Sequence, residues 1–207
     1  MINKLLLNII AVIIGAIFVI GSWITTGILD FGFFRFFSVA VFVVVVLLLI
    51  WDQWAWKWAF IQKVPRVTRD ISGTWETRLE SLWIDPDTGE SPAPKTVYII
   101  VRQTSSQATI TLISNESKSK SSIARVIRED ASWIVHYVYS NEPQVELRER
   151  SSIHHGSGVL SIVGNPAKRM AGSYWTDRNS KGKLSLVRRV KFAAEDFDDA
   201  RDLFSHV

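Results

Sequence analysis

The densest group of side chains that could do chemistry lies in residues 172–178, which read Gly-Ser-Tyr-Trp-Thr-Asp-Arg. Arg178 supplies a guanidinium, which suits bidentate contact with a phosphate group. Tyr174 and Trp175 supply ring faces on which nucleobases can stack, and Thr176 adds a hydroxyl. These residue types indicate a binding site for an anionic, aromatic ligand. The alternative is an ordinary strand end at which an acidic and a basic side chain pair in a turn.

Three more candidate binding residues lie elsewhere in the chain. Tyr137 and Tyr139 are two residues apart in a strand-like segment, so both phenols face the same side of the predicted strand. The sequence leaves open whether that side is the interior or the solvent. Arg102 stands among apolar residues of another predicted strand. It points either outward, as most arginines do, or inward towards an anion.

The residues that catalysis or metal binding would need are largely missing. The chain contains no cysteine, which excludes disulfides, thiolate nucleophiles and thiolate metal sites. His154 and His155 are adjacent, so in a strand they face opposite sides and cannot readily chelate one metal. The sequence has no nucleophile elbow, phosphate-binding glycine loop or evident carboxylate pair. We therefore expect a binding protein and not an enzyme, with no catalytic residue, metal or cofactor.

The elements that must position these residues are predominantly strands. Turn-forming residues separate eight segments with strand character and no helical pattern between them. The predicted strands cover residues 72–84, 95–104, 107–114, 117–129, 131–140, 151–163, 169–177 and 183–192. Short links favour an antiparallel meander that closes into a small lipocalin-like barrel, with room for packed side chains or one small ligand. A β-sandwich is the alternative fold. Residues 193–207 have helical spacing and predict a short amphipathic C-terminal helix.

Two apolar stretches precede this all-β domain, at residues 5–29 and 33–51. Each is long enough to cross a hydrocarbon core of ~30 Å as a helix, so we predict two transmembrane helices. A cleaved signal peptide is the alternative for the first stretch, but its apolar run is longer than such peptides carry. The middle of each stretch lacks ionisable residues, which a transport path usually needs.

Charged and aromatic residues after the second stretch predict its orientation. Basic residues follow it closely, so the positive-inside rule places both termini and the β-domain in the cytoplasm. Four tryptophans cluster at the same place and predict an aromatic belt at the headgroup level. These are Trp51, Trp54, Trp56 and Trp58. The predicted domains are a hairpin at 1–60, a basic juxtamembrane linker at 61–70 and a β-barrel sensor at 71–207.

Several motifs, together with the two N-terminal spans, resemble a known family over essentially the whole chain. The motifs are Ile71-Ser72-Gly73-Thr74-Trp75-Glu76, Tyr137-x-Tyr139-x-Asn141-x-Pro143, Ser152-Ile153-His154-x-Gly156, and Gly172-x-Tyr174-Trp175-Thr176-Asp177-Arg178 followed by Gly182. The chain resembles the two-transmembrane, β-strand-rich effectors associated with SMODS nucleotidyltransferases. Those effectors act in CBASS, the cyclic-oligonucleotide-based anti-phage signalling system of bacteria.

The resemblance implies a function and a set of partners. A CD-NTase-type nucleotidyltransferase makes a cyclic dinucleotide second messenger, which the barrel binds. The effector then forms a homo-oligomer in the lipid bilayer of the bacterial inner membrane, disrupts it, and causes abortive infection. No nucleic-acid polymer is expected as a partner. From the chemistry of their side chains, the expected ligand-binding residues are Arg102, Tyr137, Tyr139, Tyr174, Trp175, Thr176 and Arg178.

Other functions remain open on the residues alone. The barrel could be a membrane-anchored, lipocalin-like carrier of a small or lipidic ligand, or an interaction domain with a solid core. An enzyme would rest on His154 and Asp177. The sequence does not distinguish a site inside the barrel from one in an outer groove, and it leaves the ligand's bases and the oligomer number open.

Overall fold

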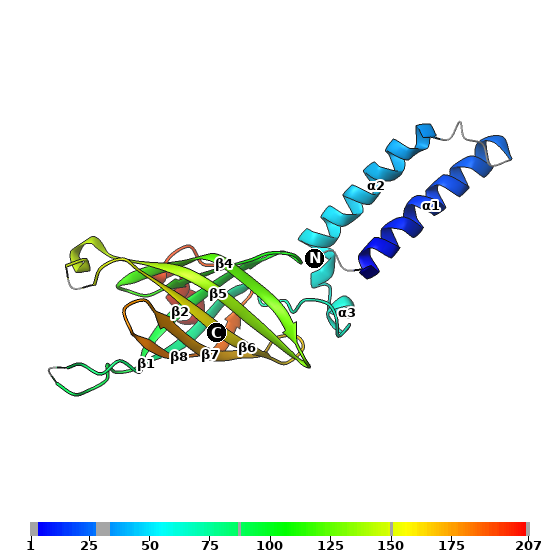
Figure 1. The fold of residues 1–207 in the computed structure, drawn as a ribbon. Helices are drawn as coiled ribbons and strands as arrows, with labels where there is room; N and C mark the ends of the chain where they lie inside the picture. Colours follow the sequence, from blue (N-terminus) through cyan, green and yellow to red (C-terminus); the bar gives the residue numbers. More distant parts are fainter. Residues whose placement is uncertain (1–3, 28–33, 87, 150, 206–207) are drawn as a thin grey trace. The chain divides into compact units, whose positions relative to one another are not determined.

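The structure, a computed structural model, describes residues 4–27, 34–86, 88–149 and 151–205. The chain divides into two compact units, Met1–Ala55 and Trp56–Val207. Figure 1 shows a pair of helices in the first unit and a barrel of strands in the second. Each unit is described below by itself.

The first unit consists of two helices, α1 (Lys4–Thr26) and α2 (Phe34–Gln53). The predicted spans extend to residue 29 and begin at residue 33, and both of these positions lie outside the described residues. Among the residues that the structure describes, no helix is both long enough and apolar enough to cross a membrane. The structure therefore confirms helices at both predicted positions, but it does not confirm that they span a membrane.

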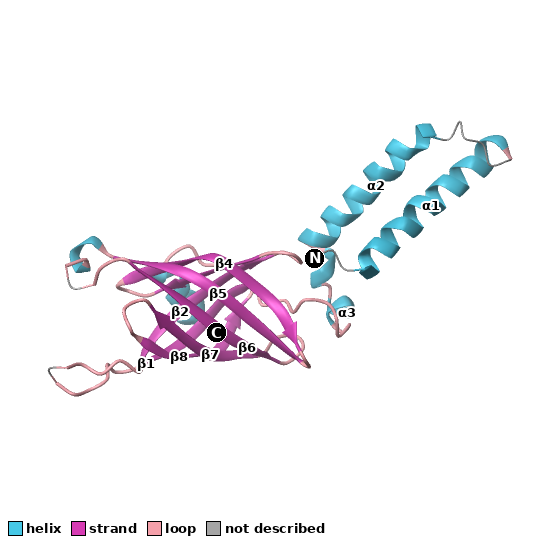
Figure 2. Cartoon of the chain, viewed as in Figure 1, coloured by secondary structure: helices cyan, strands magenta, loops and turns pink. Residues whose placement is uncertain are grey.

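The second unit contains eight antiparallel strands that form one closed barrel in sequence order, as Figure 2 shows. The strands are β1 (Gly73–Ser81), β2 (Lys95–Gln103), β3 (Ala108–Ile113), β4 (Ser117–Glu129), β5 (Ser132–Pro143), β6 (His154–Val163), β7 (Arg169–Thr176) and β8 (Lys181–Val190). This confirms the predicted barrel and excludes the sandwich. Turn chemistry explains the strand ends, because Asp130 and Asn179 adopt positive φ angles of 50° and 58°, which Asn and Asp tolerate best.

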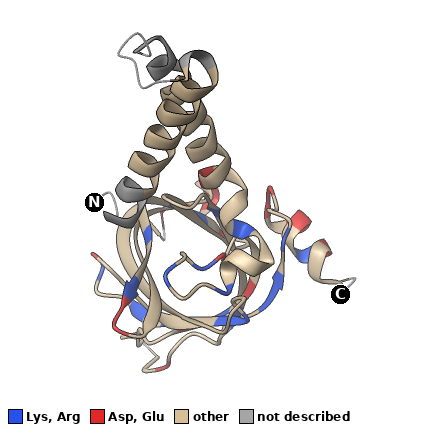
Figure 3. Cartoon of the chain, turned by 90° about the vertical axis from the view of Figure 1, so that its right-hand side faces the viewer, with Lys and Arg blue, Asp and Glu red and all other residues tan. Residues whose placement is uncertain are grey.

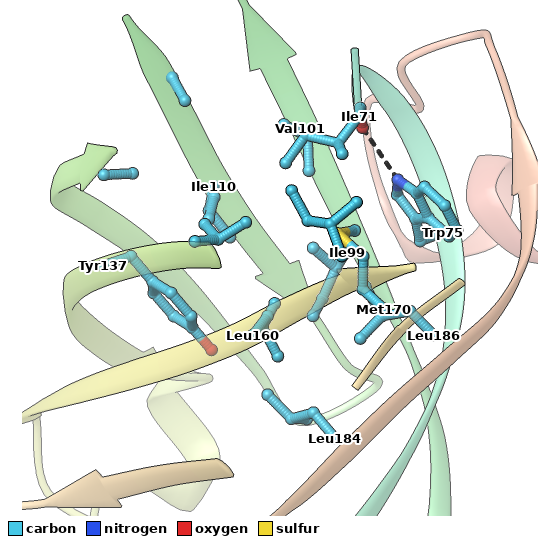
Figure 4. Close-up of a cluster of buried hydrophobic side chains, with 14 of the residues drawn as sticks. Ile71, Trp75, Ile99, Val101, Ile110, Tyr137, Leu160, Met170, Leu184 and Leu186 are labelled. Carbon is cyan, nitrogen blue, oxygen red and sulfur yellow. Dashed lines mark hydrogen bonds between the residues drawn. The ribbon is translucent and has the colours of Figure 1, made fainter. Parts of the chain in front are cut away.

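A cluster of buried apolar side chains fills part of the barrel interior, as Figure 4 shows. Trp75 on β1 is fully buried there, and its indole N–H donates to the Ile71 carbonyl at 2.9 Å. Val101, Ile99 and Met170 are also buried in this cluster. The Gly-x-Trp at the start of β1 thus places an aromatic plug in what we call the closed end of the barrel.

An ion pair secures the closed end next to Trp75. The Arg189 guanidinium donates to the Asp70 carboxylate at 3.0 Å and lies over the Trp75 ring, 5.4 Å from its centroid. It also donates to the carbonyl of Ser72. Burial by itself would raise the pKa of Asp70, but hydrogen bonds from Ser72 and the charge of Arg189 outweigh it, and the pKa falls below its usual value.

The C-terminal helix α4 (Phe197–Ser205) packs on the outer face of β2, which confirms the predicted helix. The Tyr98 ring stacks on Phe204, with centroids 5.7 Å apart, and meets Phe197 at 5.4 Å. Inward-facing residues of β2 alternate with these outward-facing ones, as a strand requires. The apolar outer residues of β2 are therefore covered by α4.

Two short helices precede the barrel, η2 (Ala55–Lys57) and α3 (Ala59–Gln62). The Gln62 side chain is buried and donates to the carbonyl oxygens of Trp56 at 2.8 Å and Thr68 at 2.9 Å. These bonds fold residues 56–68 back on themselves, and the Trp56 side chain in this stretch is fully buried. The predicted aromatic belt is therefore wrong for Trp56, whose ring is inside the protein.

We predict that Asp70→Asn destabilises the barrel and flattens the acid limb of its stability profile. A carboxyl group with a lowered folded pKa stabilises the fold above its unfolded pKa of about 3.9. This stability is lost as the pH falls through the folded value. At pH 7 the substitution should lower the free energy of unfolding by about 2 kcal/mol, because it removes hydrogen bonds to a charged group. Thermal unfolding of both proteins at pH 7 and pH 3 measures this difference.

Asp198→Asn is the matched control. The Asp198 side chain is 74% exposed and pairs with Arg201 on the surface of α4, and exposed pairs contribute little to stability. Equal losses for the two variants at pH 7 would show that the pair at the closed end is no more important than a surface pair.

Candidate ligand-binding cavity

The open end of the barrel, opposite Trp75, contains a cavity of about 880 Å³. This volume lies within the range of ~300–1,000 Å³ that is usual for small-molecule sites. Inward-facing residues from all eight strands line it, and they are Leu79, Val97, Ile110, Leu112, Ser119, Tyr137, Tyr139, Asn141, His154, Tyr174, Thr176 and Leu184. Because the side chains of these residues face the interior of the barrel, the cavity lies inside it.

The cavity has two chemically different walls. Neighbouring strands β8, β1, β2 and β3 contribute an apolar wall, which consists of Leu184, Leu79, Val97, Ile110 and Leu112. Strands β4 to β7 contribute hydroxyl, amide, imidazole and phenol groups on the other side. A ligand that fits must therefore have both an apolar or aromatic surface and polar edges.

Three tyrosines of the polar wall lie against glycines of the neighbouring strands. Tyr137 pairs with Gly158 across the β5–β6 ladder, and a Cβ at this glycine would overlap the Tyr137 ring. Gly156 supports Tyr139 in the same way, since a Cβ there would lie 2.5 Å from the ring atom Cζ. Gly182 on β8 does so for Tyr174, at 2.6 Å from Cε1. The glycines give each ring room to lie across the neighbouring strand, with its hydroxyl at the cavity.

These phenols stay protonated over the physiological pH range. Burial raises the pKa of Tyr137, and the neighbouring Tyr139 and Tyr174 raise it further. Burial also raises the pKa of Tyr139, with a further contribution from Tyr174. For Tyr174 burial again raises the pKa, opposed by a hydrogen bond with Ser81. The wall therefore offers neutral O–H donors, which suit phosphate or carbonyl oxygens of a ligand.

Asn141 continues the row of Tyr137 and Tyr139 along β5, at the next inward-facing position. It is buried, and its side-chain oxygen accepts a hydrogen bond of 2.7 Å from Ser119 across the β4–β5 ladder. This bond holds the amide in place at the cavity wall. Sequence reasoning missed Asn141 as a site residue, although its spacing of two from Tyr139 is the signal that could have found it.

Charged side chains of both signs gather at the mouth of the cavity, where Asp85, Lys95, Glu116 and Arg178 line it. Arg178 donates from Nη1 to the Ser151 hydroxyl at 3.0 Å and the Ser152 carbonyl at 3.3 Å, and lies 3.4 Å from Nδ1 of His154. Lys95 lines the same mouth and pairs with Glu116 at 3.1 Å. The sequence gives no signal for Lys95, because only barrel closure brings β2 to the same opening as Arg178.

Five of the seven residues predicted to bind ligand line the cavity: Tyr137, Tyr139, Tyr174, Thr176 and Arg178. The other two lie elsewhere. Arg102 is exposed on β2, and its neighbour Val101 is the one that points inward to the core. Trp175 is 48% exposed on β7, where Tyr174 takes the inward position. Alternation along each strand puts both residues on the outer face.

His154 and Asp177, the residues on which an enzyme would rest, contact other groups. The Asp177 carboxylate accepts a hydrogen bond of 3.1 Å from the His155 backbone N–H, and His154 contacts Arg178 at the mouth. Among the residues that the structure describes, no group of three or more His, Asp or Glu side chains could hold a metal ion. The cavity offers neutral hydroxyl donors, a guanidinium at the mouth and an apolar wall.

Two comparisons with known proteins agree with this geometry. A family model described as Cap15, cyclic dinucleotide receptor domain, matches residues 66–188, which include the whole cavity wall. The chain is also similar to CD-NTase-associated protein 15 of Staphylococcus schleiferi, with 29% identity over 157 residues. That alignment covers 76% of this chain and 81% of its relative.

We predict that Gly158→Ala displaces the Tyr137 ring and narrows the cavity. The added methyl group overlaps the ring, so the barrel should lose about 1–3 kcal/mol of stability, as overpacked cores do. A double-mutant cycle with Tyr137→Ala, followed by chemical unfolding, measures the coupling. Without the ring, Gly158→Ala should cost much less. An equal cost in both backgrounds would show that the glycine does not support the tyrosine.

Proposed function

The chain belongs to the family of Cap15 cyclic dinucleotide receptor domains, which are receptors of CBASS effectors, and from this we propose that its barrel binds a cyclic dinucleotide inside the cavity. The observation that carries the proposal is the cavity itself, which joins tyrosine rings and an apolar wall to a mouth that carries the Arg178 guanidinium. A cyclic dinucleotide carries two negative charges and two bases. Such a ligand needs cations, hydrogen-bond donors and flat apolar surfaces together.

The residues of the cavity suggest how the ligand is held. Arg178 and Lys95 lie at the mouth, where they suit the phosphate groups. Tyr137, Tyr139 and Asn141 line the inner wall, where they suit polar edges of the bases. The apolar wall opposite them suits the base and sugar faces. We propose that the activating ligand comes from a CD-NTase-type nucleotidyltransferase.

The output of the receptor is proposed to be membrane disruption by a homo-oligomer. In this proposal, α1 and α2 form a hairpin across the bacterial inner membrane, with both termini and the barrel in the cytoplasm. One pair of helices cannot enclose a pore, so disruption requires several copies. The ligand can drive their assembly only by binding the oligomer more tightly than the monomer. Shifting a population from 1:99 to 99:1 takes ~5.5 kcal/mol of differential affinity.

A carrier of an apolar ligand is the second candidate function. The observation in its favour is the apolar wall of β8, β1, β2 and β3. The polar wall of β4 to β7 opposes it, because a purely apolar ligand would leave the hydroxyl and amide groups of that wall without partners in the ligand. Mass spectrometry of the purified chain distinguishes the two functions, since a carrier should retain lipid and a receptor should not.

We predict that Arg178→Ala weakens binding of cyclic dinucleotides by about ten- to one-hundred-fold, the effect of losing a hydrogen bond between charged groups. Arg102→Ala is the matched control, because Arg102 lies on the outer face of the barrel and should leave affinity unchanged. Calorimetry of the purified full chain against a panel of cyclic dinucleotides measures both. If Arg102→Ala weakens binding and Arg178→Ala does not, the ligand lies in an outer groove. If the chain binds no member of the panel, the receptor function is rejected.

We also predict that cells which make both the ligand and the full chain lose membrane integrity, measured as uptake of an impermeant dye. Arg178→Ala should reduce uptake, because fewer receptors are occupied. Deleting residues 1–55 should abolish uptake while calorimetry still detects binding. If the deleted chain permeabilises cells as well as the full chain does, the hairpin is not the part that disrupts the membrane.

A further inference from the structure

Two aromatic side chains project from the second unit near its closed end. Trp58 is 52% exposed and Phe60 is 65% exposed, and their ring centroids are 5.6 Å apart. Val64 follows them and is 48% exposed. Large apolar side chains that lie exposed in one short segment commonly mark a contact surface. We call Trp58, Phe60 and Val64 the aromatic ledge.

The ledge is fixed to the barrel and is not part of a loose tether. Trp56, two residues before Trp58, is fully buried, and Gln62, two residues after Phe60, is 5% exposed. Asn165, in the β6–β7 connection, donates to the Gln62 carbonyl at 2.8 Å, and Arg69 donates to the same oxygen at 2.6 Å. The ledge therefore moves with the barrel as one body.

The chain segment that carries the ledge is basic. Lys57, Lys63 and Arg66 lie within this stretch of the chain, and residues 56–69 include no acidic residue. Lys63 and Arg66 are both exposed. In Figure 3, where Lys and Arg are blue, this end of the barrel faces the viewer. The surface thus combines exposed aromatic rings with exposed basic side chains.

We propose that the aromatic ledge docks the closed end of the barrel on the surface of an anionic phospholipid bilayer. Tryptophan rings favour the headgroup level of a membrane, and nearby basic side chains are attracted to anionic headgroups. Three side chains form a surface far smaller than the ~800 Å² per partner of a usual protein interface, which favours lipid over a protein partner. The inference rests on the membrane location in the proposed function.

This docking has a consequence for the sensor. The ledge lies at the closed end of the barrel, and the cavity opens at the other end. A barrel that rests on the bilayer through the ledge presents its mouth to the aqueous phase, where a soluble ligand can enter. Docking would therefore orient the receptor.

The absence of cysteine from the chain allows a clean test with single labels. The full chain with Phe60→Cys is labelled at that cysteine with NBD, a fluorophore that responds to polarity. The labelled chain is then reconstituted into vesicles with about 30% phosphatidylglycerol in phosphatidylcholine. Ile84→Cys is the matched control, since Ile84 is 61% exposed, as against 65% for Phe60, and lies in the β1–β2 connection at the open end. Depth is read from quenching by spin-labelled lipids.

The label at residue 60 should lie about 5–10 Å into the headgroup and acyl boundary, as interfacial segments do. We expect its quenching by spin-labelled lipid to be at least about two-fold stronger than that of the label at residue 84. Lys63→Gln with Arg66→Gln, or vesicles of phosphatidylcholine alone, should reduce the difference.

Equal quenching at the two positions in a chain that has entered the vesicles overturns the docking and leaves the membrane function standing. The proposal is also overturned if, in detergent, the environment of the label at residue 60 becomes less polar as the protein concentration rises. In that case the ledge would contact a second copy of the chain. A chain that stays out of the vesicles overturns the proposed membrane location and the docking with it.

Discussion

The closure of eight antiparallel strands into one barrel is the constraint on which the other features depend. Closure makes every second side chain an interior one, so the fold must either fill that interior or leave a cavity. In this barrel the interior is filled at one end and contains a cavity at the other. Trp75 and its apolar neighbours fill the closed end, and the strand ends opposite them surround about 880 Å³. The two regions are continuous, because Ile110, Tyr137, Tyr139 and Leu184 belong to the buried cluster and also line the cavity.

The binding layer depends on glycines as much as on the side chains that face the ligand. Tyr137 and Tyr139 reach their positions because Gly158 and Gly156 leave the neighbouring strand bare beneath the rings. Burial then keeps the phenols protonated. A row of neutral O–H groups beside an apolar wall can donate hydrogen bonds to an uncharged base edge and also to an anionic group.

The stretch between the helices and the barrel also has a structural role. Gln62 and Trp56 are buried, and the Gln62 carbonyl is bonded to both Asn165 and Arg69. A stretch that reads as a basic linker in the sequence is in fact packed as part of the second unit. A movement of the closed end would therefore pass directly to residue 56, without being absorbed by a flexible connection.

Local patterns in the sequence predict the elements, which are eight strands, their turns and a C-terminal helix, and the structure confirms each of them. Spacing also placed Tyr137 and Tyr139 on one face. Only the tertiary structure decided which face is inside, because a shift of one residue in register exchanges the two faces of a strand. That decision put Arg102 and Trp175 outside, although their chemistry suits a nucleotide, and it brought Lys95 to the same cavity as Arg178. No local pattern carries this information, since it arises from pairings between strands far apart in the chain.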